Sequence, residues 1–266
     1  MDLNITIISI LLIFGFFSGL ISVIAGVGGG VFFVSILTIF FFVQIDIAVD
    51  TSTFVILLSS FTGFIIYLKQ KRTNLKLSLI FSMFSILGSI LASILFYFVE
   101  LDNTLLKYIF ACTLLIAGMN MIYKAINSIK RRSNINNSAS NFILQNHDYK
   151  TNLKKSIPLF MLAGFAANFL GIGGGIINTP SLNILLDFPI HNSTAISTSI
   201  IFFTAIYNTT VKFLTGEINL LFGILLAFGS ITGSVLGAII SKKMPKGILQ
   251  FFVSSVLILL AIRMFF

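Results

Sequence analysis

The chain has 266 residues, of which 57% are hydrophobic and only 9% are charged, and its mean hydropathy is +1.05. A soluble domain carries about 25% charged residues, so this composition excludes a soluble globular protein and predicts an all-α polytopic membrane protein. The net charge of +9 does not indicate nucleic-acid binding, because the basic residues lie between apolar segments, where they determine membrane orientation.

The first predicted transmembrane repeat covers residues 1–123. Its predicted segments are a helix at 5–25, a short apolar piece at 31–43, and three longer helices at 47–68, 77–99 and 104–123. Apolar helices of about 20 residues can cross a hydrocarbon core of about 30 Å. The short piece cannot cross unaided, so we expect it to be tilted, extended by its flanks or re-entrant.

Residues 124–155 form the only extended polar stretch, rich in Asn, Ser and Lys. It contains the basic run Lys130–Arg132 and the polar run Asn134–Asn141. Such a composition cannot bury enough apolar surface to fold by itself, so it predicts a solvated linker between two membrane units.

The second predicted repeat covers residues 156–266, with segments at 157–170, 176–187, 193–214, 219–241 and 247–266. An offset of 145 residues aligns the halves without a gap. Among the matched positions are Gly19 with Gly164, Ser52-Thr53 with Ser197-Thr198, Asn74 with Asn219, and Gly88 with Gly233. Matches of Gly, Ser, Thr and Asn are not expected by chance in so apolar a chain, so we predict two homologous repeats.

The loop charges predict that the repeats are inverted relative to each other. The connection after the 47–68 helix carries Lys69, Lys71, Arg72 and Lys76, whereas its counterpart is only Thr215–Glu217. Cytoplasmic loops are enriched in Lys and Arg. We therefore expect a plasma (inner) membrane protein of eight to ten membrane segments, with a cytoplasmic linker and both termini outside. Each repeat then has five crossings, or three crossings and a re-entrant hairpin.

Glycine clusters interrupt the apolar run in each half, at Gly26, Gly28, Gly29 and Gly30 and at Gly171, Gly173, Gly174 and Gly175. Irregular backbone at membrane depth is tolerated only inside protein or beside an aqueous cavity. A short helix follows each cluster, and its first amides lack intrahelical partners and attract anions. The clusters therefore predict a two-sided anion site. The alternative is that the glycines only allow close helix packing, which we assign to Gly88, Gly233 and Gly237.

Several polar side chains are further candidates for the same site. Ser52, Thr53, Ser197 and Thr198 are expected at the starts of their helices, either as N-caps or as hydroxyl donors to the anion. Asn168, Asn178 and Thr179 flank the second glycine cluster, and polar groups inside a membrane face the protein interior or a cavity.

The ionisable residues are expected near the membrane surfaces. Asp46, Asp50 and His191 are interpreted as capping or solvated residues at helix entrances, and Lys212 and Arg263 as residues that extend to the interface. No ionisable residue lies at the centre of a predicted helix. This pattern argues against a buried carboxylate relay and fits a substrate that crosses as an anion.

The duplicated motifs G-V-G-G-G (Gly26–Gly30) and G-I-G-G-G-I-I-N-T-P-S-L (Gly171–Leu182) resemble the signature of the TauE/SafE family, the sulfite exporter or TSUP group of anion permeases. The resemblance covers nearly the whole chain and implies transport of sulfite, sulfonates or related small anions. The family pattern has a proline five residues after the last glycine. Pro180 fits it, whereas the first half has Ser35, so the first hairpin is expected to turn differently.

These observations predict a secondary transporter of a small oxyanion, embedded in the bilayer, without a cofactor, a metal site or a nucleic-acid partner. An intramembrane enzyme would need a constellation such as H-E-x-x-H or G-x-S-x-G, and the sequence contains neither. A non-transporting membrane scaffold or assembly factor is the alternative. The anion, the direction of transport and the oligomeric state stay open, with protons as the default coupling ion.

Overall fold

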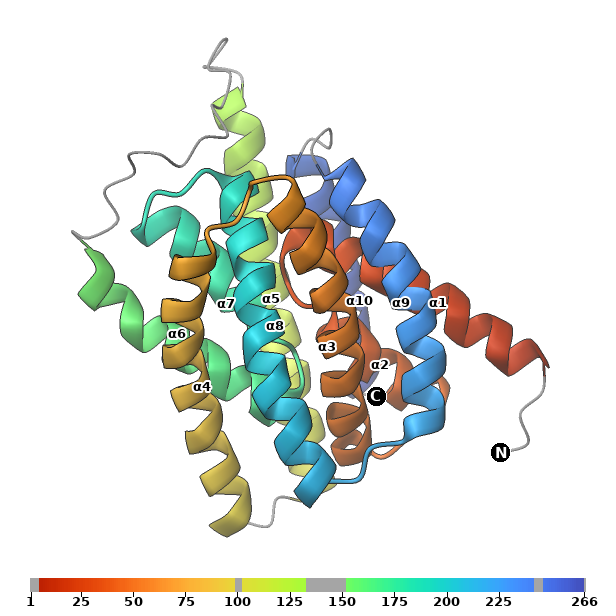
Figure 1. Cartoon of the computed structure of the whole chain (residues 1–266). Helices are drawn as coiled ribbons and strands as arrows, with labels where there is room; N and C mark the ends of the chain where they lie inside the picture. Colours follow the sequence, from red (N-terminus) through yellow and green to blue (C-terminus); the bar gives the residue numbers. More distant parts are fainter. Residues whose placement is uncertain (1–4, 99–101, 133–151, 242–245, 266) are drawn as a thin grey trace.

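The computed structural model describes residues 5–98, 102–132, 152–241 and 246–265, which form α-helices and one short π-helical segment (Figure 1). The elements are α1 Ile5–Ala25, α2 Gly30–Phe40, α3 Ile45–Lys69, α4 Leu75–Phe98, α5 Asn103–Arg132, α6 Leu153–Leu170, α7 Gly175–Pro180, the π-helix η2 Ser181–Leu185, α8 Ile190–Thr215, α9 Leu220–Ile240 and α10 Lys246–Phe265. Within the described ranges, α1, α3, α4 and α9 are long and apolar enough to cross a membrane. The protein is therefore a multi-pass helical membrane protein.

Helix α5 differs from its predicted extent. It continues to Arg132 and includes the first residues of the predicted linker. Hydropathy ends the apolar segment near 123, but the residues that follow include Lys, Ala and Ile, which a helix accepts without an apolar surrounding. The polar run Asn134–Asn141 lies outside the described residues.

Helices α3 and α8 occupy the centre of the bundle, with α1 and α9 on one side and α4 and α6 on the other (Figure 1). They pack antiparallel. Asp50 near the start of α3 pairs with Lys212 near the end of α8, whereas Arg72, just after α3, contacts His191 at the start of α8. The two ends of this central pair are therefore built from different residues.

Small residues bring the flanking helices into backbone contact. A Cβ atom on Gly88 of α4 would collide with the backbone of Met161 in α6, and one on Gly233 of α9 with that of Phe16 in α1. Gly237 also faces the backbone of α1. Such contacts are the usual means of close helix packing in membranes, and the packing role predicted for these three glycines is confirmed.

Equivalent asparagines form similar N-caps in the two halves of the chain. The Asn74 side-chain oxygen accepts a hydrogen bond from the Leu77 amide at 3.2 Å, and the Asn219 oxygen accepts one from the Phe222 amide at 3.2 Å. A capping Asn satisfies an amide that has no partner in the first turn. The matched asparagines of the sequence therefore start α4 and α9 in the same way.

The short helices of the two halves differ as Ser35 and Pro180 predict. Helix α2 runs unbroken to Phe40, and the Ser35 hydroxyl donates to the Val31 carbonyl within it. In the second half, α7 ends at Pro180 and continues as the π-helix η2. Proline lacks an amide hydrogen and disturbs the hydrogen bonds of the preceding turn, which accounts for the change.

Candidate functional site

The glycine clusters form two breaks of matching conformation between α1 and α2 and between α6 and α7. The φ angles of Gly26, Gly28 and Gly29 are 66°, 100° and 71°, and those of the equivalent Gly171, Gly173 and Gly174 are 64°, 80° and 73°. Positive φ is strained for residues with a Cβ atom. Three glycines in each break are therefore required by the backbone alone.

The two breaks contact each other in the middle of the bundle. A Cβ atom on Gly28 would lie 3.2 Å from the Cα of Gly173, one on Gly30 would collide with the Gly171 carbonyl, and one on Gly175 with the Gly26 carbonyl. The cluster glycines are all buried. The eight glycines therefore lie close together, and this close approach accounts for the absence of side chains.

Three hydroxyl groups form hydrogen bonds between the first half of the chain and the second at the glycine breaks. The Ser52 hydroxyl shares its proton between the Gly171 carbonyl at 2.9 Å and the Val49 carbonyl of its own helix at 2.7 Å, whereas the equivalent Ser197 hydroxyl donates to the Gly26 carbonyl at 2.8 Å. The Thr179 hydroxyl donates to the same Gly26 carbonyl at 2.8 Å. These hydroxyls therefore lie at the breaks, as predicted, but in this conformation they bond to backbone oxygen.

The N-cap interpretation of the Ser-Thr pairs is wrong, because α3 already begins at Ile45 and α8 at Ile190. Thr53 and Thr198 lie well inside these helices. Their hydroxyls donate to the backbone carbonyls of Asp50 and Thr194 in their own helices, at 2.7 and 2.9 Å. Hydropathy places the starts at 47 and 193, which is too late, since Asp46 and His191 interrupt the apolar pattern without interrupting the helix.

Little free space lies beside the breaks. A void of about 10 Å³ is lined by residues that include Thr53, Gly173 and Asn208, which is room for about one water molecule. Asn178, in the first turn of α7, is buried, and neither of its side-chain polar atoms has a hydrogen-bond partner among the described residues. The predicted site residues are thus close together but tightly packed.

A larger cavity, of about 430 Å³, lies at one end of the central helix pair. Its lining residues are Asp46, Val49, Asp50, Ser93, Phe96, Tyr97, Leu106, Asn168, Val211, Lys212, Thr215 and Gly216. Asn168 is fully buried and donates from its side-chain nitrogen to the Ser93 hydroxyl at 2.6 Å and to the Ser89 carbonyl at 2.8 Å. Because Asn168 lies one turn before Gly171, the cavity reaches the neighbourhood of the second break.

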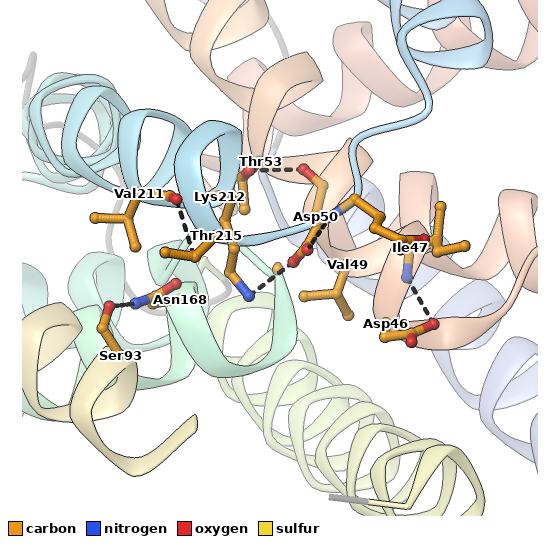
Figure 2. Close-up of polar contacts among 12 residues, drawn as sticks. Asp46, Ile47, Val49, Asp50, Thr53, Ser93, Asn168, Val211, Lys212 and Thr215 are labelled. Carbon is orange, nitrogen blue, oxygen red and sulfur yellow. Dashed lines mark hydrogen bonds and ion pairs between the residues drawn. The ribbon is translucent and has the colours of Figure 1, made fainter. Parts of the chain in front are cut away.

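Lys212 and Asp50 form a buried ion pair in the wall of this cavity (Figure 2). The Lys212 Nζ lies 2.7 Å from Asp50 Oδ1 and 4.5 Å from the centre of the Phe96 ring. Asp50 Oδ2 accepts a hydrogen bond from the Glu217 amide at 3.2 Å. The prediction that Lys212 extends to the interface is therefore wrong, and Asp50, expected as a capping or solvated residue, lies inside α3 and is buried. Both residues turn inward because each neutralises the other.

The opposite end of the central pair is closed around Arg72. The Arg72 guanidinium donates to the Ser241 hydroxyl at 2.7 Å and to the His191 carbonyl at 3.0 Å, and it lies over the Tyr67 ring at 4.7 Å. Burial lowers the pKa of Arg72 from its ordinary value, although arginine keeps its proton in proteins. His191 is half-buried and belongs to the polar cluster around Arg72, which the sequence did not predict.

Two similar proteins that are named as probable membrane transporters support a transport role for this protein. The chain is 26% identical to the probable membrane transporter protein YunE of Bacillus subtilis (strain 168), over 97% of both chains. It is 28% identical to a probable membrane transporter protein of Methanocaldococcus jannaschii, over 93% of this chain and 91% of that protein. No solved structure matches the chain significantly.

The family comparison agrees with the duplicated glycine motifs. The sequence model described as Sulfite exporter TauE/SafE matches residues 11–264, a range that includes both glycine breaks, the cavity and the central helix pair. The protein belongs to the TauE/SafE family.

Proposed function

We propose that this membrane transporter is a secondary transporter of a small oxyanion, with sulfite, sulfonates and related anions as the substrate class. The observation that carries the proposal is the meeting of two glycine breaks of matching conformation beside a cavity whose wall holds a buried lysine. Helix starts with free amides bind anions without a charged side chain. The amides that follow Gly29 and Gly174 are the proposed ligands.

The two repeats are proposed to be inverted, with the substrate site between them. Register-equivalent helices α3 and α8 pack antiparallel, as the contacts at their two ends require. A twofold axis that exchanges two antiparallel helices is perpendicular to them. Inverted repeats in secondary transporters are related by such an axis, which lies in the membrane plane. This relation supports alternating access, in which one repeat moves against the other around the glycine breaks.

The packed breaks imply that the anion does not occupy their centre in this conformation. The void beside Thr53 and Gly173 has room for about one water molecule. The anion is therefore proposed to enter through the cavity at the Asp50–Lys212 end and to reach the break amides when the two breaks move apart. Protons remain the default coupling ion.

The test uses purified protein in proteoliposomes and counterflow of sulfite against sulfate, ethanesulfonate and acetate. We expect saturable transport of at least one of these anions by the wild type. Gly29→Ala and Gly174→Ala should abolish it, because a Cβ atom at these positive φ angles costs about 1 kcal/mol or more and would crowd Ser22 or Ala163. Both variants must remain folded and monodisperse in detergent.

The matched control is Gly223→Ala in α9, where a Cβ atom would meet mainly the side chains of Phe54 and Thr51, at 3.1 and 3.4 Å. This variant should transport like the wild type. If no anion moves, or if the two break variants transport normally, the glycines serve packing alone and the scaffold alternative takes the place of this proposal.

A further inference from the structure

Four polar side chains from four different helices line the cavity at the end of the central helix pair. This cavity quartet consists of Asp50 of α3, Ser93 of α4, Asn168 of α6 and Lys212 of α8. Figure 2 shows Asn168 joined to Ser93 and lying on the same side of the site as the Lys212 ammonium. The four residues are not neighbours in sequence, so the fold alone brings them together.

The register-equivalent positions of the other repeat carry no such groups. With the offset of 145 residues, Asp50 corresponds to Ala195, Ser93 to Ala238, Asn168 to Val23 and Lys212 to Tyr67. These four residues form one buried apolar cluster at the opposite end of the molecule. The Tyr67 hydroxyl, which donates to the Val23 carbonyl at 2.8 Å, is the polar group among them, and none of the four is charged. Packing therefore does not require charged side chains at these positions, and the Asp50–Lys212 pair calls for a reason other than folding.

One atom of the quartet has a hydrogen-bonding capacity that the described residues do not use. The Asn168 side-chain oxygen is buried and has no hydrogen-bond partner among them, although its nitrogen makes two hydrogen bonds. A buried acceptor without a partner costs free energy unless a ligand or water donates to it. The neighbouring cavity of about 430 Å³ has room for such a ligand, and a small turn of the Asn168 side chain, which is closed to solvent here, would let its oxygen face that space.

The charges of the cavity restrict the charge of that ligand. Asp50 is neutralised by Lys212 and by the Glu217 amide, and Asp46 is exposed at the rim, where it accepts a hydrogen bond from the Ile47 amide. A singly charged anion can replace one carboxylate oxygen at the Lys212 ammonium. A doubly charged anion would meet more repulsion from the two aspartates.

We infer that Lys212 and Asn168 form an anion subsite in this cavity, specific for a singly charged oxyanion that carries its own hydrogen-bond donor. The oxyanion accepts from the Lys212 ammonium, and an O–H or N–H on the adjacent part of the ligand donates to the Asn168 oxygen. Asp50 holds Lys212 in place when the subsite is empty and competes with the ligand for it. The inference rests on the proposed transport of small oxyanions and names the chemistry of the substrate.

The subsite is tested by ligand binding rather than by transport, with the purified full-length chain in detergent. The measurement is the half-saturating concentration of 2-hydroxyethanesulfonate and of ethanesulfonate in a thermal-unfolding assay. The two probes differ only in the hydroxyl group. We expect the hydroxylated probe to bind wild type about threefold to tenfold more tightly, as one neutral hydrogen bond provides.

The variants of the ion pair should shift binding in opposite directions. Lys212→Gln should weaken binding of both probes about tenfold or more, through loss of a charge-assisted hydrogen bond. Asp50→Asn should tighten it, because the competing carboxylate is gone, even though the unliganded protein becomes less stable. A merely structural ion pair would not produce tighter binding. Lys107→Gln, which changes a lysine outside the cavity wall, is the control and should bind like the wild type.

Asn168→Val tests the second ligand contact, since valine occupies the equivalent position 23. It should abolish the preference for the hydroxylated probe. The double variant Asp50→Ala/Lys212→Tyr copies the apolar end and removes both charges together, so it should fold and bind neither probe. This variant remains informative if Lys212→Gln alone fails to fold.

The inference is overturned if wild type binds neither probe, if Lys212→Gln or the double variant binds like Lys107→Gln, or if Asn168→Val keeps the preference. Binding that depends on Lys212 without any transport in proteoliposomes would leave the subsite in place and overturn the proposed function. Transport that is unchanged in Lys212→Gln would leave the proposed function in place and overturn the subsite.

Discussion

At the scale of single residues, the hydroxyl groups of Ser52 and Ser197 join the two halves of the chain. Each donates from a central helix to a carbonyl of the opposite glycine break, at 2.9 and 2.8 Å. Breaks in a helix leave carbonyls without their intrahelical partners, and inside a membrane no water replaces them. Serine at these positions therefore stabilises an irregular backbone that the glycines only permit.

The two serines are equivalent in register, but their removal should have unequal effects. Ser52→Ala leaves the Gly171 carbonyl without its side-chain donor and should cost about 1–3 kcal/mol. Ser197→Ala should cost less, because the Gly26 carbonyl keeps its hydrogen bond from Thr179. The measurement is the free energy of unfolding in one detergent, with Ser59→Ala as control, since that hydroxyl bonds only to its own helix. Equal losses at both serines would contradict this account.

The sequence predicted which residues gather at the breaks but not what their side chains contact. The glycines, Ser52, Ser197 and Thr179 could be found because both repeats or the flanking motif mark them. Lys212 was missed because a lysine near a helix end is ordinarily a solvated residue, and its partner is 162 positions away in sequence. A comparison of the repeats at their unlike positions, rather than their matched ones, would have indicated it.

At the scale of helices, backbone contact through glycine holds together the flanking pairs α4–α6 and α1–α9.

Hydropathy predicted the long helices closely, because their apolar runs match the bilayer thickness. It could not predict the π-helix after Pro180 or the helical extension of α5 to Arg132. Those features depend on local backbone hydrogen bonds and on helix propensity, which hydropathy does not measure.

Alanine substitutions should distinguish glycines that contact the backbone of a facing helix from glycines that face only movable side chains. Gly88→Ala and Gly233→Ala place a Cβ atom against the backbone of the facing helix, which cannot move aside as a side chain can. Each should cost about 1–3 kcal/mol through overpacking. The control Gly223→Ala should be nearly neutral or stabilising. Thermal unfolding in detergent distinguishes the two classes, and a similar loss in all three variants would contradict the assignment.

At the scale of the whole molecule, the two ends of the central helix pair have different characters. One end holds the cavity and the Asp50–Lys212 ion pair. The other is closed by the apolar cluster of Val23, Tyr67, Ala195 and Ala238, next to the buried Arg72. Under the proposed alternating access, this difference corresponds to a conformation that is open to one side of the membrane and closed to the other.

The loop charges predict which side is which, and cysteine labelling can test it. The chain has one cysteine, Cys112, so a Cys112→Ser background permits a single reporter at Lys71 after α3 or at Glu217 after α8, both of which are exposed. In intact cells, a membrane-impermeant maleimide should label Glu217→Cys, whereas Lys71→Cys should react only after the membrane is opened, because basic connections stay in the cytoplasm. Labelling of both from the same side would contradict the proposed inversion, since these connections follow equivalent helices. Labelling with the sides exchanged would keep the inversion and place the cavity, with its Lys212 subsite, on the cytoplasmic face.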